Sequence, residues 1–175
     1  DLGGVPVNQE CPSRIFGIPG TYDICLTVED DQGNSETLCR NGLIRVLNLP
    51  QPDFSADDVT GCVPMTVEYR DQSVSSDGTI TTWLWGLGGP CGTVLGGGAS
   101  PDATCTYAIP DSYNISLTIT DDNGCTNTIT KTDYIQASAR PPVDVQVNTG
   151  FGCDPPFQAS FTNNSPLTNV NFNWD

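Results

Sequence analysis

Hydrophobic residues fall at every second position in two stretches of the chain that nearly repeat each other. Thr21–Gly33 reads TYDICLTVEDDQG, and Ser112–Gly124 reads SYNISLTITDDNG. Alternation with a period of two, carried by β-branched and aromatic residues, predicts a strand with one buried face. The acidic pair and the glycine that close each stretch are typical of a turn into an antiparallel partner strand. The two copies lie 91 residues apart (113 − 22), which favours a tandem array of β domains.

The repeat divides the chain into three segments. Residues 50–138 hold about seven short strands separated by turn signals, which predicts a complete immunoglobulin-like sandwich. Residues 1–49 match the second half of such a unit, and residues 139–175 begin a further copy, so the chain is expected to be a window on a longer array. Short proline-rich segments precede residues 53 and 143 and predict stiff, extended linkers. The expected fold is all-β, with tandem immunoglobulin-like sandwiches.

Two features of the central segment bear on its core. Trp83 and Trp85 alternate along Thr79–Trp85 and are expected on one buried face, where large aromatic rings supply much of a small core. The glycine-rich run from Gly86 to Gly98 is predicted to lack regular structure.

The charge balance argues against one class of partner. Six basic and 21 acidic residues give a net charge of −15 (6 − 21), so the chain repels phosphate backbones and nucleic-acid binding is not expected. The charge is spread through predicted loops, which is typical of a solvated acidic surface. The sequence contains no apolar run of about 18 residues, so no transmembrane segment is expected.

The cysteine content indicates the compartment. The chain has eight cysteines, no CxxC pair and no histidine, which favours structural disulfides over zinc or redox sites. Disulfides persist outside the reducing cytosol, so an extracellular or cell-surface location is expected.

The central segment resembles the PKD (polycystic kidney disease) domain, an immunoglobulin-like β-sandwich. The pattern covers nearly all of 50–137 and includes Phe54, Pro64, Val67, Tyr69, Asp71, Trp83-Leu84-Trp85, Tyr107 and the alternation from Tyr113 to Gly124. One departure is that Gly86-Leu87-Gly88-Gly89 replaces the family's usual D-F-G-D-G after Trp85. The Gly-Cys-x-Pro and Asn-Gly-Cys elements resemble PKD arrays of large secreted, gliding-associated adhesins of Bacteroidetes-type bacteria. This resemblance implies a stalk, filament or adhesin segment at the cell surface.

Two local disulfides are predicted. Cys25 and Cys39 lie on the two arms of the first hairpin, and their midpoint, position 32, falls in the turn Asp30–Gly33. Cys91 and Cys105 bracket the glycine-rich run and are expected to close it.

A third disulfide is predicted from the cysteines that remain. Cys62 and Cys125 would tie the opening turn of the central segment to its last hairpin. Cys153 repeats Cys62, and neither Cys153 nor Cys11 has an evident partner. Eight cysteines allow 105 connectivities, so alternatives to these pairs stay open.

Catalysis is not expected, and calcium is the one metal for which the sequence offers candidate ligands. Without histidine there is no Ser-His or Cys-His nucleophile pair, and no P-loop, GxSxG or HExxH motif is present. Asp57 with Asp58, and Asp121 with Asp122, supply the hard oxygen ligands that calcium prefers. No DxDxDG loop is present, so ordinary turn chemistry is the competing interpretation.

The sequence therefore predicts a structural or adhesive surface segment rather than an enzyme. Its expected partners are neighbouring repeats of the same chain, with lateral self-association into filaments and binding of surface glycans as further hypotheses. The alternative is a spacer or carbohydrate-binding accessory module of a secreted hydrolase. No cofactor is expected apart from the calcium hypothesis.

Overall fold

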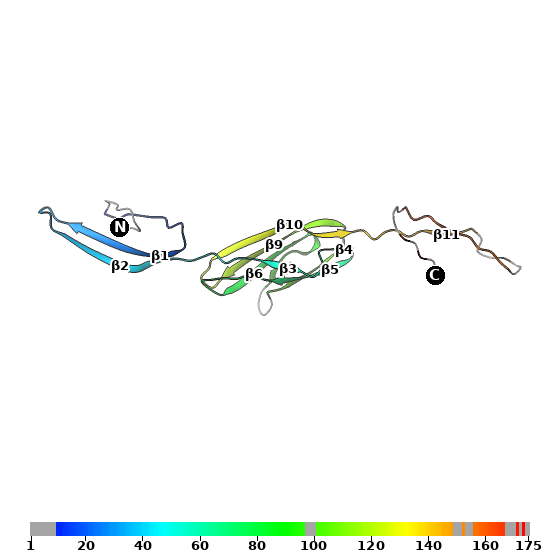
Figure 1. Ribbon diagram of the computed structural model, residues 1–175, viewed down its shortest axis with the longest axis horizontal. Helices are drawn as coiled ribbons and strands as arrows, with labels where there is room; N and C mark the ends of the chain where they lie inside the picture. Colours follow the sequence, from blue (N-terminus) through cyan, green and yellow to red (C-terminus); the bar gives the residue numbers. More distant parts are fainter. Residues whose placement is uncertain are drawn as a thin grey trace.

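The computed structural model describes residues 10–96, 101–148, 152, 156–166, 171 and 173, with backbone alone at 94–96. Its regular elements are almost all strands (Figure 1). The strands are β1 (Gly20–Glu29), β2 (Ser35–Val46), β3 (Phe54–Ala56), β4 (Thr60–Cys62), β5 (Met65–Asp71), β6 (Ile80–Gly88), β7 (Gly92–Gly96), β8 (Ala103–Tyr107), β9 (Asp111–Asp121), β10 (Thr126–Ser138), β11 (Val145–Val147) and β12 (Phe161–Asn163). A single 3-10 turn, η1 (Gly89–Cys91), separates β6 from β7 within this part of the chain.

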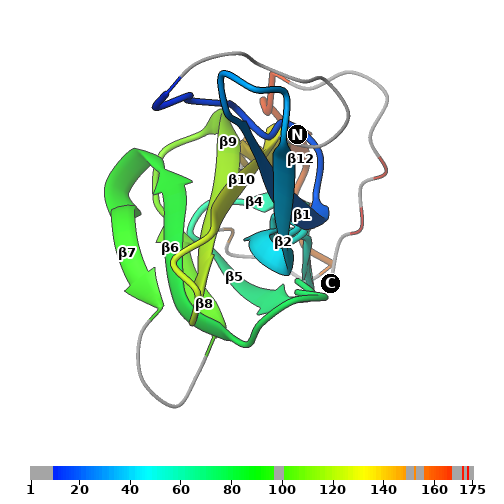
Figure 2. The same cartoon turned by 90° about the vertical axis from the view of Figure 1, so that its left-hand side faces the viewer.

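Eight of these strands, β3 to β10, form a two-layered sandwich. One sheet has the order β4-β10-β9-β6-β7, and the facing sheet has the order β3-β5-β8. Figure 2 shows β7 at the outer edge of the larger sheet. Most neighbours are antiparallel, but β4 runs parallel to the end of β10. This arrangement confirms the prediction of an all-β, immunoglobulin-like sandwich.

The alternating residues that predicted the strands line the space between the two sheets. In β9 the residues at every second position are buried, whereas most of those between them are exposed or half-buried, as a strand with one core face requires. β5 and β8 alternate in the same way. The buried core consists of Phe54, Met65, Val67, Tyr69, Trp85, Leu87, Ala103, Cys105, Tyr107, Tyr113, Ile115, Leu117, Ile119, Ile135 and Ala137.

The polar atoms of this core have partners. The hydroxyl of Tyr107 donates to the carbonyl of Leu87 at 2.7 Å, so the hydroxyl of Tyr69, also 2.7 Å away, donates to Tyr107. Trp85, which is fully buried, donates its indole N–H to the carbonyl of Pro101 at 2.9 Å. Burial, and then the hydrogen bond to Tyr107, raises the pKa of Tyr69 well above its usual value, so the hydroxyl stays neutral.

The glycine-rich run is more ordered than the sequence predicts. The prediction that Gly86 to Gly98 lacks regular structure is wrong for its described part, because β6 continues to Gly88 and β7 begins at Gly92. Gly88, Gly89 and Gly92 have φ of 65°, 48° and 54°, which is the left-handed region that glycine adopts most easily. The glycines thus shape a tight β6–β7 connection. Gly97 and Gly98 lie outside the described residues.

The β1–β2 hairpin has the same construction as the β9–β10 hairpin. Each has a register shift at the equivalent place, between Tyr22 and Ile24 in the first and opposite Tyr113 and Ile115 in the second. Each first tyrosine donates its hydroxyl to the carbonyl four residues earlier, at 2.6 Å in Tyr22 and 2.7 Å in Tyr113. The sequence repeat is therefore also a repeat of backbone geometry.

The strand pair β11–β12 copies β3–β5 in a similar way. Ser73 exchanges hydrogen bonds with the backbone of Asp53, and Ser165 does the same with Asp144. The backbone N–H of each serine also donates to the side chain two residues earlier, at 3.0 Å to Asp71 and 2.9 Å to Asn163. Figure 1 shows this pair at the opposite end of the sandwich from the β1–β2 hairpin. The boundaries 1–49, 50–138 and 139–175 stay predictions.

Candidate functional site

The loop before β6 binds the end of the β1–β2 hairpin to the sandwich through hydrogen bonds. The carboxylate of Asp77 accepts three hydrogen bonds from the end of β2 and the residues that follow it. They come from the guanidinium of Arg45 at 3.0 Å, the backbone N–H of Asn48 at 2.8 Å and the side-chain amide of Asn48 at 2.7 Å. We call Arg45, Asn48 and Asp77 the junction cluster. It joins the incoming chain to the loop before β6 through these three hydrogen bonds.

The β9–β10 turn holds Asp77 in place. The side-chain amide of Asn123 donates to the carbonyl of Asp77 at 3.0 Å, and Asp122 accepts the N–H of Thr79 at 2.9 Å. Asp121 shapes the turn itself, because its carboxylate accepts the N–H groups of Asn123 and Cys125. The conspicuous acidic pair of the sequence therefore supports the junction as well as the turn.

The linker after Asn48 is part of the sandwich rather than a free tether. Pro50 is fully buried, and its carbonyl accepts the side-chain amide of Asn127 at 2.9 Å. Gln51 and Val74 exchange two backbone hydrogen bonds at 2.8 and 3.0 Å. A docked linker of this kind limits the angles between the hairpin and the sandwich.

A lysine secures the far end of this linker. The ammonium of Lys131 on β10 lies 3.0 Å from the carboxylate of Asp53 and also donates to the carbonyl of Phe54. It sits 4.4 Å from the centre of the Phe54 ring and 5.3 Å from that of Tyr134, in cation–π range. The ion pair with Lys131, chiefly through its hydrogen bond, lowers the pKa of Asp53.

The junction carboxylate is stabilised in its charged form. The pKa of Asp77 is lowered, first by the backbone N–H of Asn48, then by the side chain of Asn48, and in smaller part by Arg45. Each of these donors favours the ionised carboxylate. The junction cluster is therefore formed at neutral pH and weakens in acid.

The structure contains two of the three predicted disulfides, and the third predicted pair is not formed. It contains the disulfides Cys25–Cys39, directly opposite each other in β1 and β2, and Cys91–Cys105, which joins η1 to β8.

The predicted pair Cys62–Cys125 is wrong. Both thiols are free, with Cys62 beside the last residue of β10 and Cys125 just before its first. A strand of 13 residues spans roughly 40 Å, far beyond the reach of a disulfide. Cys11 is also free and exposed, and Cys153 lies outside the described residues.

The aspartates considered for calcium are not brought together. Asp57 follows β3, and the neighbouring Val59 bonds to Gln136 near the end of β10, whereas Asp121 and Asp122 precede the start of β10. Asp57 accepts the N–H groups of Asp58 and Glu68. Among the described residues no group of three His, Cys, Asp or Glu side chains is placed to hold a metal ion. Calcium binding stays a prediction without a shared set of ligands.

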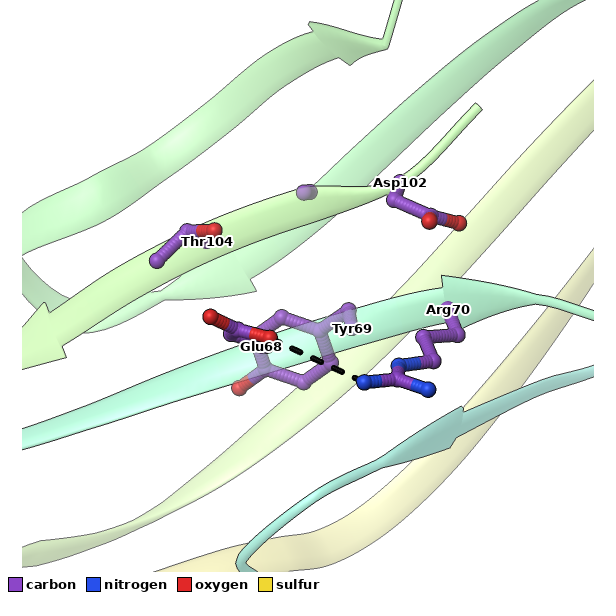
Figure 3. Close-up of a pocket in the computed structure, with 6 residues that line it drawn as sticks. Glu68, Tyr69, Arg70, Asp102 and Thr104 are labelled. Carbon is purple, nitrogen blue, oxygen red and sulfur yellow. Dashed lines mark ion pairs between the residues drawn. The ribbon is translucent and has the colours of Figure 1, made fainter. Parts of the chain in front are cut away.

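A shallow cavity of about 350 Å³ lies on the outer face of β5 and β8 (Figure 3). Glu68 and Arg70 extend from β5 over it and form a loose ion pair at 3.9 Å, while Asp102 and Thr104 approach from the β8 side. The Tyr69 ring points into the core and is fully buried, so it offers no surface to a ligand. The cavity is polar and lacks an exposed aromatic ring among its lining residues.

The part of the chain that the structure describes contains no helix long and apolar enough to cross a bilayer. The disulfides are of the kind that persist in oxidising compartments.

Comparison with solved structures gives similar sandwiches. The PKD1 domain of the Vibrio cholerae metalloprotease PrtV is 27% identical, with a TM-score of 0.43, covering 53% of this chain and 100% of that one. The PKD1 domain of Vibrio anguillarum Epp is 24% identical, with a TM-score of 0.45, over 54% of this chain and 100% of that one. A carbohydrate-binding module structure of the β-sandwich superfamily is 19% identical, with a TM-score of 0.48, over 58% of this chain and 44% of that one. No curated protein matches the chain.

The family is shown by sequence. Residues 48–137, which are 90 of the 175 residues (137 − 48 + 1), match the model of the PKD domain. The matched segment begins at Asn48 of the junction cluster and ends within β10. The chain belongs to the PKD domain family.

Proposed function

We propose that this chain is a rigid structural segment of an extracellular adhesin, in which tandem PKD domains form a stalk at the cell surface. The observation that carries the proposal is the junction cluster, in which the carboxylate of Asp77 holds both Arg45 and Asn48. A stalk transmits position and force only if successive modules keep a fixed angle. The buried Pro50 and the Lys131–Asp53 ion pair continue the same attachment along the linker.

The acidic surface suits this function. With a net charge of −15, neighbouring stalks repel each other and stay apart at low ionic strength. The disulfides Cys25–Cys39 and Cys91–Cys105 restrain the unfolded chain and make each module harder to open.

A spacer or carbohydrate-binding accessory module is the second candidate. The polar cavity over Glu68 and Thr104 is the feature that favours it. Sugar sites commonly pair polar groups with an exposed aromatic ring, and the one aromatic residue lining this cavity is buried. The stalk is therefore the better supported of the two. A glycan array probed with the whole chain tests the carbohydrate-binding module, which should bind at least one glycan class.

Nuclear magnetic resonance relaxation tests the rigid junction. Backbone amides in β1–β2 should report the same rotational correlation time as those in β9–β10. Asp77→Ala should shorten the correlation time of the hairpin alone, because both Arg45 and Asn48 lose their acceptor. Asp58→Ala removes the same charge from an exposed position without a side-chain role in the junction and should leave both values equal. A hairpin that tumbles independently in the unmodified chain would contradict the proposal.

A further inference from the structure

One free thiol of the sandwich lies beside the linker that leaves it. Cys62 on β4 is in register with Ser138, the last residue of β10, and its Sγ lies 4.0 Å from the carbonyl oxygen of Ala139. Figure 1 shows β4 where the chain leaves the sandwich toward β11. The exposed thiol of Cys62 therefore lies against the first residue of the outgoing linker.

A second free thiol lies beside the linker that enters the sandwich. Asn123, two residues before Cys125, donates its side-chain amide to the carbonyl of Asp77 in the junction cluster. Asn127, two residues after Cys125, donates its side-chain amide to the carbonyl of Pro50 at 2.9 Å. The start of the incoming linker is therefore held by residues on both sides of Cys125.

The repeat makes these two linkers equivalent. Arg40 and Lys131 hold the same place in the registers of the two hairpins, with an offset of 91 residues (131 − 40). The same offset places Ala139 at the position of Asn48 (139 − 91). The residue that one free thiol contacts as the chain leaves a unit is thus the residue that begins the linker beside the other thiol in the following unit.

We propose that successive units of the array are joined by a disulfide between the cysteine at the position of Cys62 in one unit and the cysteine at the position of Cys125 in the next. This inference rests on the tandem array of the proposed function and adds a covalent bond to its junctions. Within one sandwich the two thiols cannot pair, because the 13 residues of β10 separate them. Cysteines left over in a chain that contains disulfides suggest pairing beyond the unit.

The sequence shows that one of these cysteines belongs to the repeat. Cys153 stands in the same Gly-Cys-x-Pro element as Cys62. At the place of Cys125 the first hairpin has Asn34, 91 residues earlier (125 − 34). The proposed bond therefore applies to junctions at which both cysteines are present, and Asn34 supplies a substitution that the repeat itself tolerates.

Formation of this bond is an oxidation. Each thiol gives up one proton and one electron, and an S–S bond forms between the two sulfur atoms. A small-molecule disulfide such as oxidised glutathione accepts both electrons and both protons and leaves as two thiols. Oxidising extracellular compartments allow this exchange.

A chain with one duplicated unit tests the proposal. Residues 1–138 followed directly by residues 48–175 keep the spacing of 91 residues and place two sandwiches in tandem, each with its own complete core. After equilibration with oxidised and reduced glutathione, the monomer fraction is digested without reduction. Mass spectrometry should then find a peptide that links Cys62 to Cys125.

One substitution made in either copy identifies the linked thiols. Cys125→Asn in the second sandwich should abolish the linked peptide, because it removes the thiol at the new junction. Cys125→Asn in the first sandwich is the matched control and should leave the linked peptide intact. A linked peptide that survives the first change, or that is lost with the second, would overturn the proposal.

The full-length secreted protein gives a measurement that does not depend on the duplicated chain. Its thiols are alkylated before digestion, and the peptide that contains Cys125 should be linked to a Gly-Cys-x-Pro peptide of the adjoining unit. An alkylated Cys125 in that protein would refute the proposed bond.

Relaxation of the duplicated chain separates failure of this inference from failure of the proposed function. Two sandwiches with one correlation time and free thiols would refute the disulfide and retain the rigid stalk. Linked sandwiches that tumble independently would support the disulfide and contradict the rigid stalk. Independent tumbling with free thiols would contradict both.

Discussion

Gly42 and Asp133 occupy the same left-handed backbone position in two hairpins. Their φ angles are 63° and 50°, and Asp133 is the one non-glycine residue with positive φ in the described part of the chain. Each donates its N–H to the side chain of the residue 19 positions earlier, Asp23 at 2.7 Å and Asn114 at 2.8 Å. Both hairpins therefore have a bulge with a left-handed residue at this position, which is glycine in the first hairpin and aspartate in the second.

This bulge gives a test at position 133. Asp133→Val should lower the free energy of unfolding of the sandwich by about 1–2 kcal/mol, because a β-branched side chain clashes in the left-handed region. Urea denaturation followed by tryptophan fluorescence measures the loss. Asp133→Asn is the matched control and should change stability by less than about 0.5 kcal/mol, since asparagine tolerates this conformation. Equal effects of the two variants would refute the backbone explanation.

The tyrosine pair in the core predicts unequal costs for two similar changes. Tyr69→Phe removes one donor and leaves Tyr107 bonded to Leu87, so we expect a loss of about 1 kcal/mol. Tyr107→Phe leaves the Tyr69 hydroxyl without its acceptor and the Leu87 carbonyl without its donor, so about 2–3 kcal/mol is expected. Both variants are measured by urea denaturation. A larger cost for Tyr69→Phe would reverse the inferred direction of the hydrogen bonds.

The first disulfide should stabilise the hairpin locally. An isolated two-stranded hairpin is marginal in water, and a disulfide closing a separation of 14 residues contributes about 3 kcal/mol by loop closure. Replacing Cys25 and Cys39 by serine should abolish hydrogen-exchange protection in β1–β2 while β9–β10 stays protected. Replacing Cys62 and Cys125 by serine is the matched control, and it should leave protection unchanged because both thiols are free.

Acid should loosen the junction before it unfolds the sandwich. The pKa of Asp77 is lowered in the folded chain from its ordinary value of 3.8, so its stabilising contribution is complete above that value. The contribution is lost as the pH falls through the lowered pKa, when Asp77 takes up a proton. Relaxation of the hairpin amides measured from pH 6 to pH 2.5 should show decoupling only below the ordinary pKa value of 3.8. A junction that stays rigid when Asp77 is protonated would contradict this account.

Much of the sandwich follows from local sequence. The alternation from Tyr113 to Ile119 determined one core strand, and the position of Trp85 placed a ring at the centre of the core. These features depend only on side-chain periodicity and burial, which a single strand already displays. The resemblance to the PKD domain was recognised partly from the same residues.

Other features depend on contacts between residues far apart in the sequence, which the periodicity of a single strand cannot predict. The Cys62–Cys125 pair failed because the parallel pairing of β4 places Cys62 at the far end of β10. The junction cluster was missed because Asp77 lies in an ordinary polar loop, and its partners Arg45 and Asn48 come from about 30 residues earlier. The acidic turn at Asp121 was visible, but its role as a support for that loop appears only in three dimensions.

The parallel pairing of β4 with β10 has a mechanical consequence. Gln136, Ala137 and Ser138 face Thr60, Gly61 and Cys62 where the chain leaves the sandwich. A pull along the molecule acts along these two strands, so their hydrogen bonds are sheared together instead of opening one after another. Such a clamp resists tension until several bonds break at once, and the module would hold its length under load and then yield abruptly.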